Sequence, residues 1–360
     1  MSQTPATHHI SDWSAFHLDP DQKKRLFLSE IQGLCDYHDA NCQAYHDLVT
    51  KLPWQATPYH TLNDVPFLPV RLFKNHRLMS VDESQIVKTM TSSGTTSQIR
   101  SQIFLDRETS ALQVKILSKI MADFIGPLRL PMLVIDCKAT VKERLRFSAR
   151  TAGILGFSMF GRKVEYALDD DMSLNIERIK SFIATFPDQP ILLFGFTFIV
   201  WQHVVLELEK QNIHLPLDKA ILIHGGGWKQ MLAQSVTGDE FKSRLKDCCA
   251  LDKVHNYYGM VEQTGSIFME CEAGHLHASS WSEIIIRNPL DFSISPIGEQ
   301  GLVQLLSLIP RSYPGHSLLS EDLGRIIGHD TCSCGRKGTF FAIDGRLKKA
   351  EMRGCSDTYS

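Results

Sequence analysis

The sequence contains no apolar run long enough to cross a membrane, and its first residues lack the basic and then apolar pattern of a secretion signal. It also lacks a basic excess. Its 38 Lys and Arg residues against 40 Asp and Glu give a net charge of -2, so nucleic-acid binding has no electrostatic support. Internal repeats and low-complexity segments are absent, which disfavours a solenoid. We therefore expect a cytoplasmic protein with no nucleic-acid partner and no membrane span.

The nine cysteines form no evident disulfide framework, because they are odd in number and scattered along the chain. Free thiols, metal ligands and a nucleophile remain as interpretations. The composition, 43% hydrophobic and 22% charged over 360 residues, is that of an ordinary globular protein. The length allows one large or two medium domains.

The apolar pattern predicts an α/β fold. Residues 19–48 read as helical, and short apolar runs then alternate with longer amphipathic segments, which predicts buried strands joined by crossover helices. The apolar runs are 131–135, 190–194 and 219–223, and the amphipathic segments are 110–124, 174–186 and 198–211. After residue 265 shorter β-like pieces follow, at 284–287, 302–309 and 325–327.

These patterns divide the chain into four expected parts. A helical N-terminal region (1–80) is packed on the body, and an α/β body (81–265) follows it. A small β-rich subdomain (266–346) and a short tail (347–360) complete the chain.

A loop with the sequence TSSGTTSQ, residues 91–98, offers almost only hydroxyl side chains around a glycine. Hydroxyls and unhindered backbone N–H groups around Gly94 can wrap a phosphate, although the Lys-Ser/Thr ending of a P-loop is missing. A Ser/Thr-rich surface turn is the alternative.

Three later motifs add to a nucleotide interpretation. Tyr258 and Gly259 stand before Glu262, a carboxylate that can hold a magnesium ion bridging phosphates. Asp322 can accept hydrogen bonds from ribose hydroxyls, and Arg346 follows a turn and can complete a sugar or phosphate contact. Each residue alone is more typical of a turn, a solvated carboxylate or a surface cation.

In this order the motifs resemble those of the adenylate-forming superfamily of acyl-CoA synthetases and luciferase-like ligases, over residues 91–354. Segments 66–74, 147–161 (FSARTAGILGFSMFG) and 353–357 look like the acyl-protein synthetase (LuxE) family, which serves the fatty-acid reductase of bacterial luminescence. The resemblance implies the N-terminal domain of an adenylate-forming enzyme, with layered α/β subdomains, a small β-rich subdomain and the usual C-terminal domain reduced to a short tail. ATP and magnesium are the implied cofactors.

The resemblance also implies roles for single residues. It assigns the loop around Gly94 to the ATP phosphates, through Ser92, Ser93, Thr95 and Thr96. Glu262 takes magnesium and, with Thr95, acts in catalysis by stabilising charge at phosphorus. Asp322 and Arg346 take the ribose. The adenine is lined by Gly225, Gly226, Gly227 and Tyr258, the last followed by Gly259.

The chain departs from the superfamily near its end. Most members continue into a domain with a catalytic lysine, for which residues 347–360 leave no room. The tail carries Cys355 beside Arg353, and neighbouring cations favour the thiolate that would accept an activated acyl group. In the resembled family this cysteine is self-acylated before the acyl group passes to an acyl reductase partner. An unreactive surface cysteine is the alternative.

Three functions remain open from the sequence. The first is an acyl-protein synthetase that acts on a carboxylic acid, of the long-chain fatty class. The second is a ligase that delivers the acyl or aryl group to coenzyme A or a carrier protein. The third is a non-catalytic scaffold for a reductase, suggested by Ser97 where the superfamily has glycine.

A separate group of residues suggests a metal. Cys332 and Cys334 form a C-x-C, and CEAGHLH supplies Cys271, His275 and His277. Four ligands from two hairpin-like segments, Cys271, His277, Cys332 and Cys334, would suit a structural tetrahedral zinc. Independent thiols and solvated histidines are the alternative, because C-x-C is tighter than the usual spacing.

Arg150, within FSARTAGILGFSMFG, could meet a carboxylate or a partner.

Overall fold

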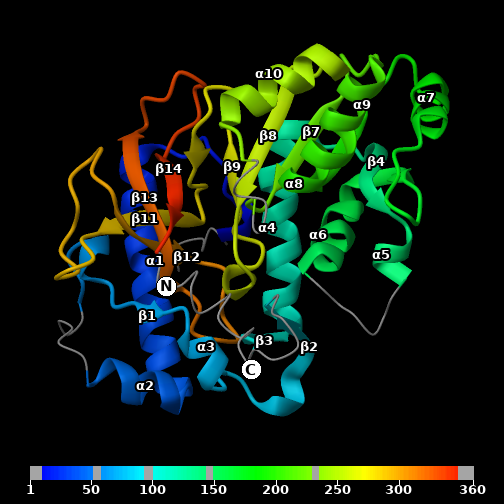
Figure 1. The fold of residues 1–360 in the computed structure, drawn as a ribbon. Coiled ribbons are helices and arrows are strands. Elements are labelled where there is room, and N and C mark those ends of the chain that lie inside the picture. Colours follow the sequence, from blue (N-terminus) through cyan, green and yellow to red (C-terminus); the bar gives the residue numbers. More distant parts are fainter. Residues whose placement is uncertain (1–9, 52–57, 93–99, 143–148, 229–234, 348–360) are drawn as a thin grey trace, which may run out of the picture. The chain divides into compact units, whose positions relative to one another are not determined.

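The computed structural model (Figure 1) describes residues 10–51, 58–92, 100–142, 149–228 and 235–347. The chain divides into two compact units, the first comprising residues 1–120, 259–268 and 275–360 and the second residues 121–258 and 269–274. Five residues with predicted roles, Ser93, Gly94, Thr95, Thr96 and Cys355, lie outside the described residues. No helix in the described ranges combines the length and apolarity needed to cross a membrane.

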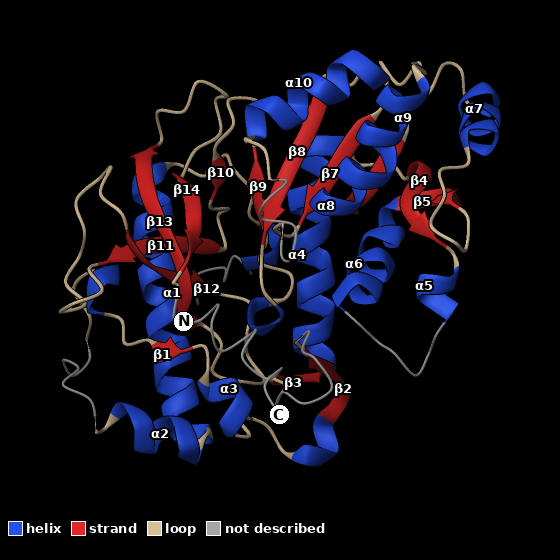
Figure 2. Cartoon of the chain, in the orientation of Figure 1, coloured by secondary structure: helices blue, strands red, loops and turns tan. Residues whose placement is uncertain are grey.

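The second unit is built on a parallel sheet, which includes the strands labelled β4, β5, β7 and β8 in Figure 2. Its strands are β4 (Leu130–Cys137), β5 (Gly161–Leu168), β6 (Leu192–Phe196), β7 (Ile221–Gly225) and β8 (Lys253–Tyr258). They lie in the order β5-β4-β6-β7-β8, and every neighbouring pair is parallel. All residues of β4, β6 and β7 are buried, as expected for strands covered on both faces. The three predicted apolar strands are confirmed.

Helices precede and connect these strands. They are α4 (Arg107–Ile125), α5 (Ala139–Lys142), α6 (Ala149–Phe157), α7 (Ile176–Thr185), α8 (Thr197–Val200), α9 (Leu206–Gln211) and α10 (Gly238–Cys249), with π-helical residues Trp201–Val205 between α8 and α9. Asn175 and Thr237 cap α7 and α10 by accepting backbone N–H bonds. A Cβ at Gly153 on α6 would stand 2.9 Å from the Phe196 ring, so this glycine lets the helix pack closely on the sheet.

The strand order creates a switch point in this sheet. From β4 the chain turns to one side to form β5 and then returns to the other side to form β6. Connections that leave in opposite directions open a crevice at the carboxyl ends of the two central strands, where α/β proteins bind ligands. Asp136 near the end of β4 and Thr197 just after β6 lie at these ends.

The first unit contains an antiparallel sheet in the order β11-β12-β13-β14-β10. These strands are β10 (Leu276–His277), β11 (Ser282–Arg287), β12 (Gly301–Ser307), β13 (Ser317–His329) and β14 (Thr339–Arg346), and β9 (Phe268–Glu270) precedes β10. The short β1 (Leu68–Pro69) pairs in parallel with β13 at Leu318 and Leu319. A separate hairpin joins β2 (Ile86–Thr91) to β3 (Gln102–Asp106). The β-rich character predicted after residue 265 is confirmed.

The helices of the first unit come early in the chain and include α1 (Pro20–Asn41), α2 (Gln43–Val49) and α3 (Leu72–Asn75). Asp19 caps α1 by accepting from Gln22 N, with Pro20 in the first helical position. Short 3-10 turns lie at Ile10–Asp12, Leu62–Asp64 and Glu83–Gln85. Trp281, fully buried, donates from Nε1 to Ile10 O at 2.7 Å, which ties the start of the described chain to the β-rich region.

Candidate active site and metal cluster

Glu262 lies in a 3-10 turn (Val261–Gln263) of the first unit. Its side chain is buried, and burial raises the pKa of the carboxyl, while a hydrogen bond from Ser101 and the cations Lys74 and Arg346 act in the opposite direction. The backbone oxygen of Glu262 accepts from Tyr313 Oη at 2.9 Å, which fixes the turn. A divalent cation bound beside such a buried carboxyl group would stabilise its ionised form.

Ser92 connects the predicted phosphate loop to this carboxylate. At the end of β2, Ser92 N donates to Ser101 O at 3.1 Å, and Ser101 N donates to Ser92 Oγ at 3.0 Å. The two serines close the base of the loop, and the Ser101 hydroxyl contacts Glu262. The structure therefore brings Ser92 and Glu262 together through Ser101. Sequence reasoning did not single out Ser101, which stands just beyond the loop with no motif of its own.

Asp322 and Arg346 face each other across β13 and β14. Arg346 Nε lies 3.5 Å from Asp322 Oδ1, and Arg346 Nη2 lies 3.4 Å from Glu321 Oε2. Glu321 also pairs with Arg71, which holds the carboxylate in place. The positive charge of Arg346 also lowers the pKa of Glu262, and we refer to Glu262, Asp322 and Arg346 as the charged cluster of the first unit.

The predicted adenine glycines end β7 in the second unit, and their surroundings differ. A Cβ at Gly225 would stand 2.4 Å from the ring of Tyr257, so this glycine makes room for a buried tyrosine, whose pKa burial raises to about 12. Gly226 has a φ of +78°, in the left-handed region that favours glycine. Gly227 has open space where a Cβ would be, and Tyr258 ends the neighbouring strand β8. Of the three glycines, Gly227 leaves most room for a ligand.

Two further polar groups lie near the switch point of the second unit. His224, buried near the end of β7, has Nδ1 2.9 Å from Thr197 Oγ1, and burial lowers its pKa to about 3, so the ring is neutral. Its sequence context, an apolar run, gave no functional signal. Asp136 is also buried and takes a bidentate pair from Arg150, with both N to O distances 2.5 Å. The carboxylate partner that the sequence suggested for Arg150 is therefore Asp136.

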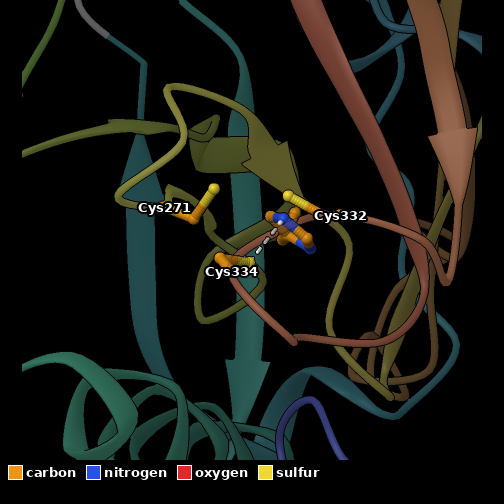
Figure 3. Close-up of side chains that lie close together, drawn as sticks. Cys271, Cys332 and Cys334 are labelled. Carbon is orange, nitrogen blue, oxygen red and sulfur yellow. Dashed lines mark hydrogen bonds between the residues drawn. The ribbon is translucent and has the colours of Figure 1, made fainter.

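The residues predicted as metal ligands gather in one place. One ligand atom from each of Cys271, His277, Cys332 and Cys334 lies within 4.8 Å of the other three. Cys334 Sγ is 3.4 Å from His277 Nε2, the contact dashed in Figure 3. The four residues come from the turn after β9, from β10 and from the loop between β13 and β14, and none of the three cysteines takes part in a disulfide.

Solved structures similar to this one are adenylate-forming ligases. A 2-hydroxyisobutyryl-CoA ligase in the postadenylation state, in complex with R3-HIB-AMP, aligns with a TM-score of 0.69 and 18% identity, covering 92% of this chain and 69% of that one. The same ligase in an open conformation, in complex with 2-HIB-AMP and CoA, aligns with a TM-score of 0.68 and covers 76% of that chain. At this identity the likeness shows the fold, and the predicted fold class is confirmed.

Two curated relatives carry the name long-chain-fatty-acid--luciferin-component ligase. The Vibrio harveyi protein is 25% identical over 93% of this chain and 87% of its own length, and the Aliivibrio fischeri protein is 24% identical over 82% and 78%. The family described as "Acyl-protein synthetase, LuxE" matches residues 3–360. The chain is therefore a ligase that belongs to the acyl-protein synthetase LuxE family.

Proposed function

We propose that this ligase is an ATP-dependent acyl-protein synthetase that activates a long-chain fatty acid as its acyl adenylate and then acylates its own Cys355. The observation that carries the proposal is the charged cluster of the first unit. Its Glu262 is linked through Ser101 to Ser92, and the positive charge of Arg346 acts on the same carboxyl group. A nucleotide with its magnesium ion needs such a set: hydroxyls for phosphate, a carboxylate for the cation and an Asp–Arg pair for ribose.

The first step joins the acid to AMP. A carboxylate oxygen of the acid attacks the α-phosphorus of ATP, the bond from that phosphorus to the bridging oxygen breaks, and pyrophosphate leaves. Magnesium, when bound, neutralises charge on the phosphate oxygens. In this chain Glu262 would hold the cation, and Ser92 with Ser93, Thr95 and Thr96 would donate hydrogen bonds to the phosphates.

The second step transfers the acyl group to sulfur. The Cys355 thiolate attacks the acyl carbon, the bond from that carbon to the phosphate oxygen breaks, and AMP leaves. The acyl group then passes to a nucleophile of an acyl reductase partner, and the Cys355 thiolate leaves as the bond from its sulfur to the acyl carbon breaks. The fatty-acid class is supported by the names of the two curated relatives, and the self-acylated cysteine and the reductase by the family resemblance.

The test incubates purified protein with magnesium, ATP and radiolabelled tetradecanoic acid, followed by denaturation and hydroxylamine. We expect hydroxylamine-sensitive label on the chain, its loss in Cys355→Ala, and retained acyl-adenylate formation in that variant. Cys248→Ala, which alters a buried cysteine of α10, is the matched control and should keep the label. Adenylate with no label on the chain, but acyl transfer to added coenzyme A, would instead establish an external thiol acceptor. If neither acyl adenylate nor labelled chain is formed, the result contradicts the ligase chemistry itself.

A further inference from the structure

Two turns of the same design carry three of the clustered thiols. In the segment CEAG, Gly274 N donates to Cys271 O at 3.0 Å, and in CSCG, Gly335 N donates to Cys332 O at 3.0 Å. Both glycines have a left-handed φ, +78° at Gly274 and +84° at Gly335. Each turn therefore begins with a cysteine whose backbone position is set by the glycine three residues later.

We propose that Cys271, His277, Cys332 and Cys334 bind one zinc ion that holds these two turns together. Cys271 and His277 are only six residues apart, on the turn and the strand of one short segment, so the chain itself keeps them near each other. The second pair comes from the loop that joins β13 to β14. Figure 3 shows Cys332 and Cys334 on that loop and Cys271 on a separate one.

The spacing of the ligand atoms fits a tetrahedral ion. Zn–S bonds of about 2.3 Å and Zn–N bonds of about 2.0 Å place neighbouring ligand atoms roughly 3.5 to 3.8 Å apart. The observed contact between Cys334 Sγ and His277 Nε2 is 3.4 Å, and all four atoms lie within 4.8 Å of one another. A small contraction of the cluster completes the coordination sphere. Three thiolates and one imidazole leave no open position for water, so the ion would be structural.

The surroundings of the cluster fix the imidazole and supply a second layer of contacts. The His277 ring stacks on Phe340 at a centroid distance of 5.7 Å and meets Phe16 edge-on at 6.3 Å, so its orientation does not depend on the ion. His275 Nδ1 lies 3.5 Å from Cys332 Sγ, where an N–H can donate to a metal-bound thiolate.

Zinc bound at this cluster would stabilise the position of the chain segment that precedes Cys271. Cys271 directly follows Glu270, whose carboxylate accepts from Asn256 N at 3.0 Å and from Lys242 Nζ at 2.8 Å. The chain between Asn256 and Glu270 includes Tyr258, Gly259 and Glu262, the residues predicted for nucleotide binding. The ion would thus support that segment without contacting substrate. The inference stands independently of the acyl-transfer proposal, because its readout is metal content.

The first measurement is the zinc content of the full chain, purified from cells grown with zinc and dialysed without chelator. We expect one zinc per chain, and near-complete loss of the metal in Cys334→Ser and His277→Ala. Cys248→Ser is the matched control and should keep the metal, since Cys248 lies in α10 outside the cluster. A metal content near zero in the wild-type chain, with the cluster cysteines either alkylated rapidly in the native state or joined by a disulfide, would overturn the proposal.

A second measurement does not depend on how the variants fold. A mercurial reagent is titrated into the wild-type chain with a chromogenic zinc indicator present, and we expect the metal to be released as the cluster thiols react. Exchange for cobalt should then give the thiolate-to-metal charge-transfer bands and the intense visible bands of a tetrahedral ion. Zinc that is released before any thiol reacts, or cobalt spectra of an octahedral oxygen site, would show that the metal is held elsewhere.

Discussion

Asp322 on β13 and Arg346 on β14 stand opposite each other in antiparallel register, with Arg346 Nε 3.5 Å from Asp322 Oδ1. This separation is longer than a strong charge-assisted hydrogen bond, and the Arg346 side chain is half-exposed. Both groups can therefore form shorter bonds with a ligand that carries hydroxyls or phosphate. The loose pair is consistent with the ribose contact that we propose for it.

Replacing Asp322 by Ala should weaken ATP use. Loss of two charge-assisted hydrogen bonds to ribose is expected to lower kcat/KM for ATP by about 10²- to 10⁴-fold, mainly through KM, since each such bond contributes roughly 1.5 to 3 kcal/mol. Acid-dependent ATP–pyrophosphate exchange measures the effect. Arg325→Ala, which removes an ion pair with Asp344 between the same two strands, is the control and should leave KM near the wild-type value. Equal losses in both variants would argue for a structural effect.

Replacing Glu262 by Gln should separate catalysis from stability. We expect exchange activity to fall by about 10²- to 10³-fold, because the magnesium carboxylate is lost. Burial raises the folded-state pKa of Glu262, so its favourable contribution to stability is complete below the unfolded pKa of about 4.3 and is lost as the pH rises through the folded value.

Gln imitates the protonated acid at every pH. The variant should therefore be more stable than the wild type at pH 7 without nucleotide, and the two should converge near pH 4. Urea unfolding across this range measures the difference. A variant that is less stable at pH 7 would show that ionised Glu262 is already compensated by its neighbours.

Gly225, the last residue of β7, and Gly227, two residues beyond it, should respond differently to replacement by alanine. Gly225→Ala places a Cβ 2.4 Å from the Tyr257 ring, so we expect a loss of about 1 to 3 kcal/mol in the free energy of unfolding. Gly227→Ala meets nothing within 4 Å and should leave stability unchanged while raising KM for ATP. Thermal unfolding and exchange kinetics on both variants test the split. An unchanged KM in Gly227→Ala would exclude this glycine from the adenine site.

Buried histidines should make the fold sensitive to acid. Burial lowers the pKa of His38 and His224 to about 3, against about 6.5 in the unfolded chain. Their contribution is present above pH 6.5 and is lost as the pH falls toward 3, at up to about 1.4 kcal/mol per pH unit for each histidine. His38→Gln should flatten the dependence of unfolding free energy on pH between 6.5 and 4.5. His60→Gln, at an exposed position, is the control and should keep the wild-type slope.

The apolar runs were sufficient to predict the core strands, because residues covered on both faces leave a continuous hydrophobic signature. Residues 131–135, 190–194 and 219–223 all lie in or beside the parallel strands found there. The two-residue strand β1 could not be predicted in this way. Its position is set by pairing with β13, and Leu68 and Pro69 carry no local signal for that contact.

The cluster of Cys271, His277, Cys332 and Cys334 could be anticipated because its residue types are distinctive and occur in two short segments. Ser101 and Tyr313 could not. A serine and a tyrosine have no single chemical role, and their contacts with Glu262 exist only once distant parts of the chain have met. The pair of Asp136 and Arg150 could be predicted only in part. Arg150 suggested a carboxylate partner, but its identity depended on how α6 packs beside β4.

The pairing of Leu68 with Leu318 also bears on how the protein is made. About 250 residues separate the two partners, so at ribosomal speeds of roughly 5 to 20 residues per second β1 waits about 12 to 50 s for its neighbour to be synthesised. During that interval the early helices of the first unit cannot pack on a complete sheet, so their apolar residues stay accessible to chaperones. Newly made chains should thus resist protease in the region of α1 only after translation has passed β13.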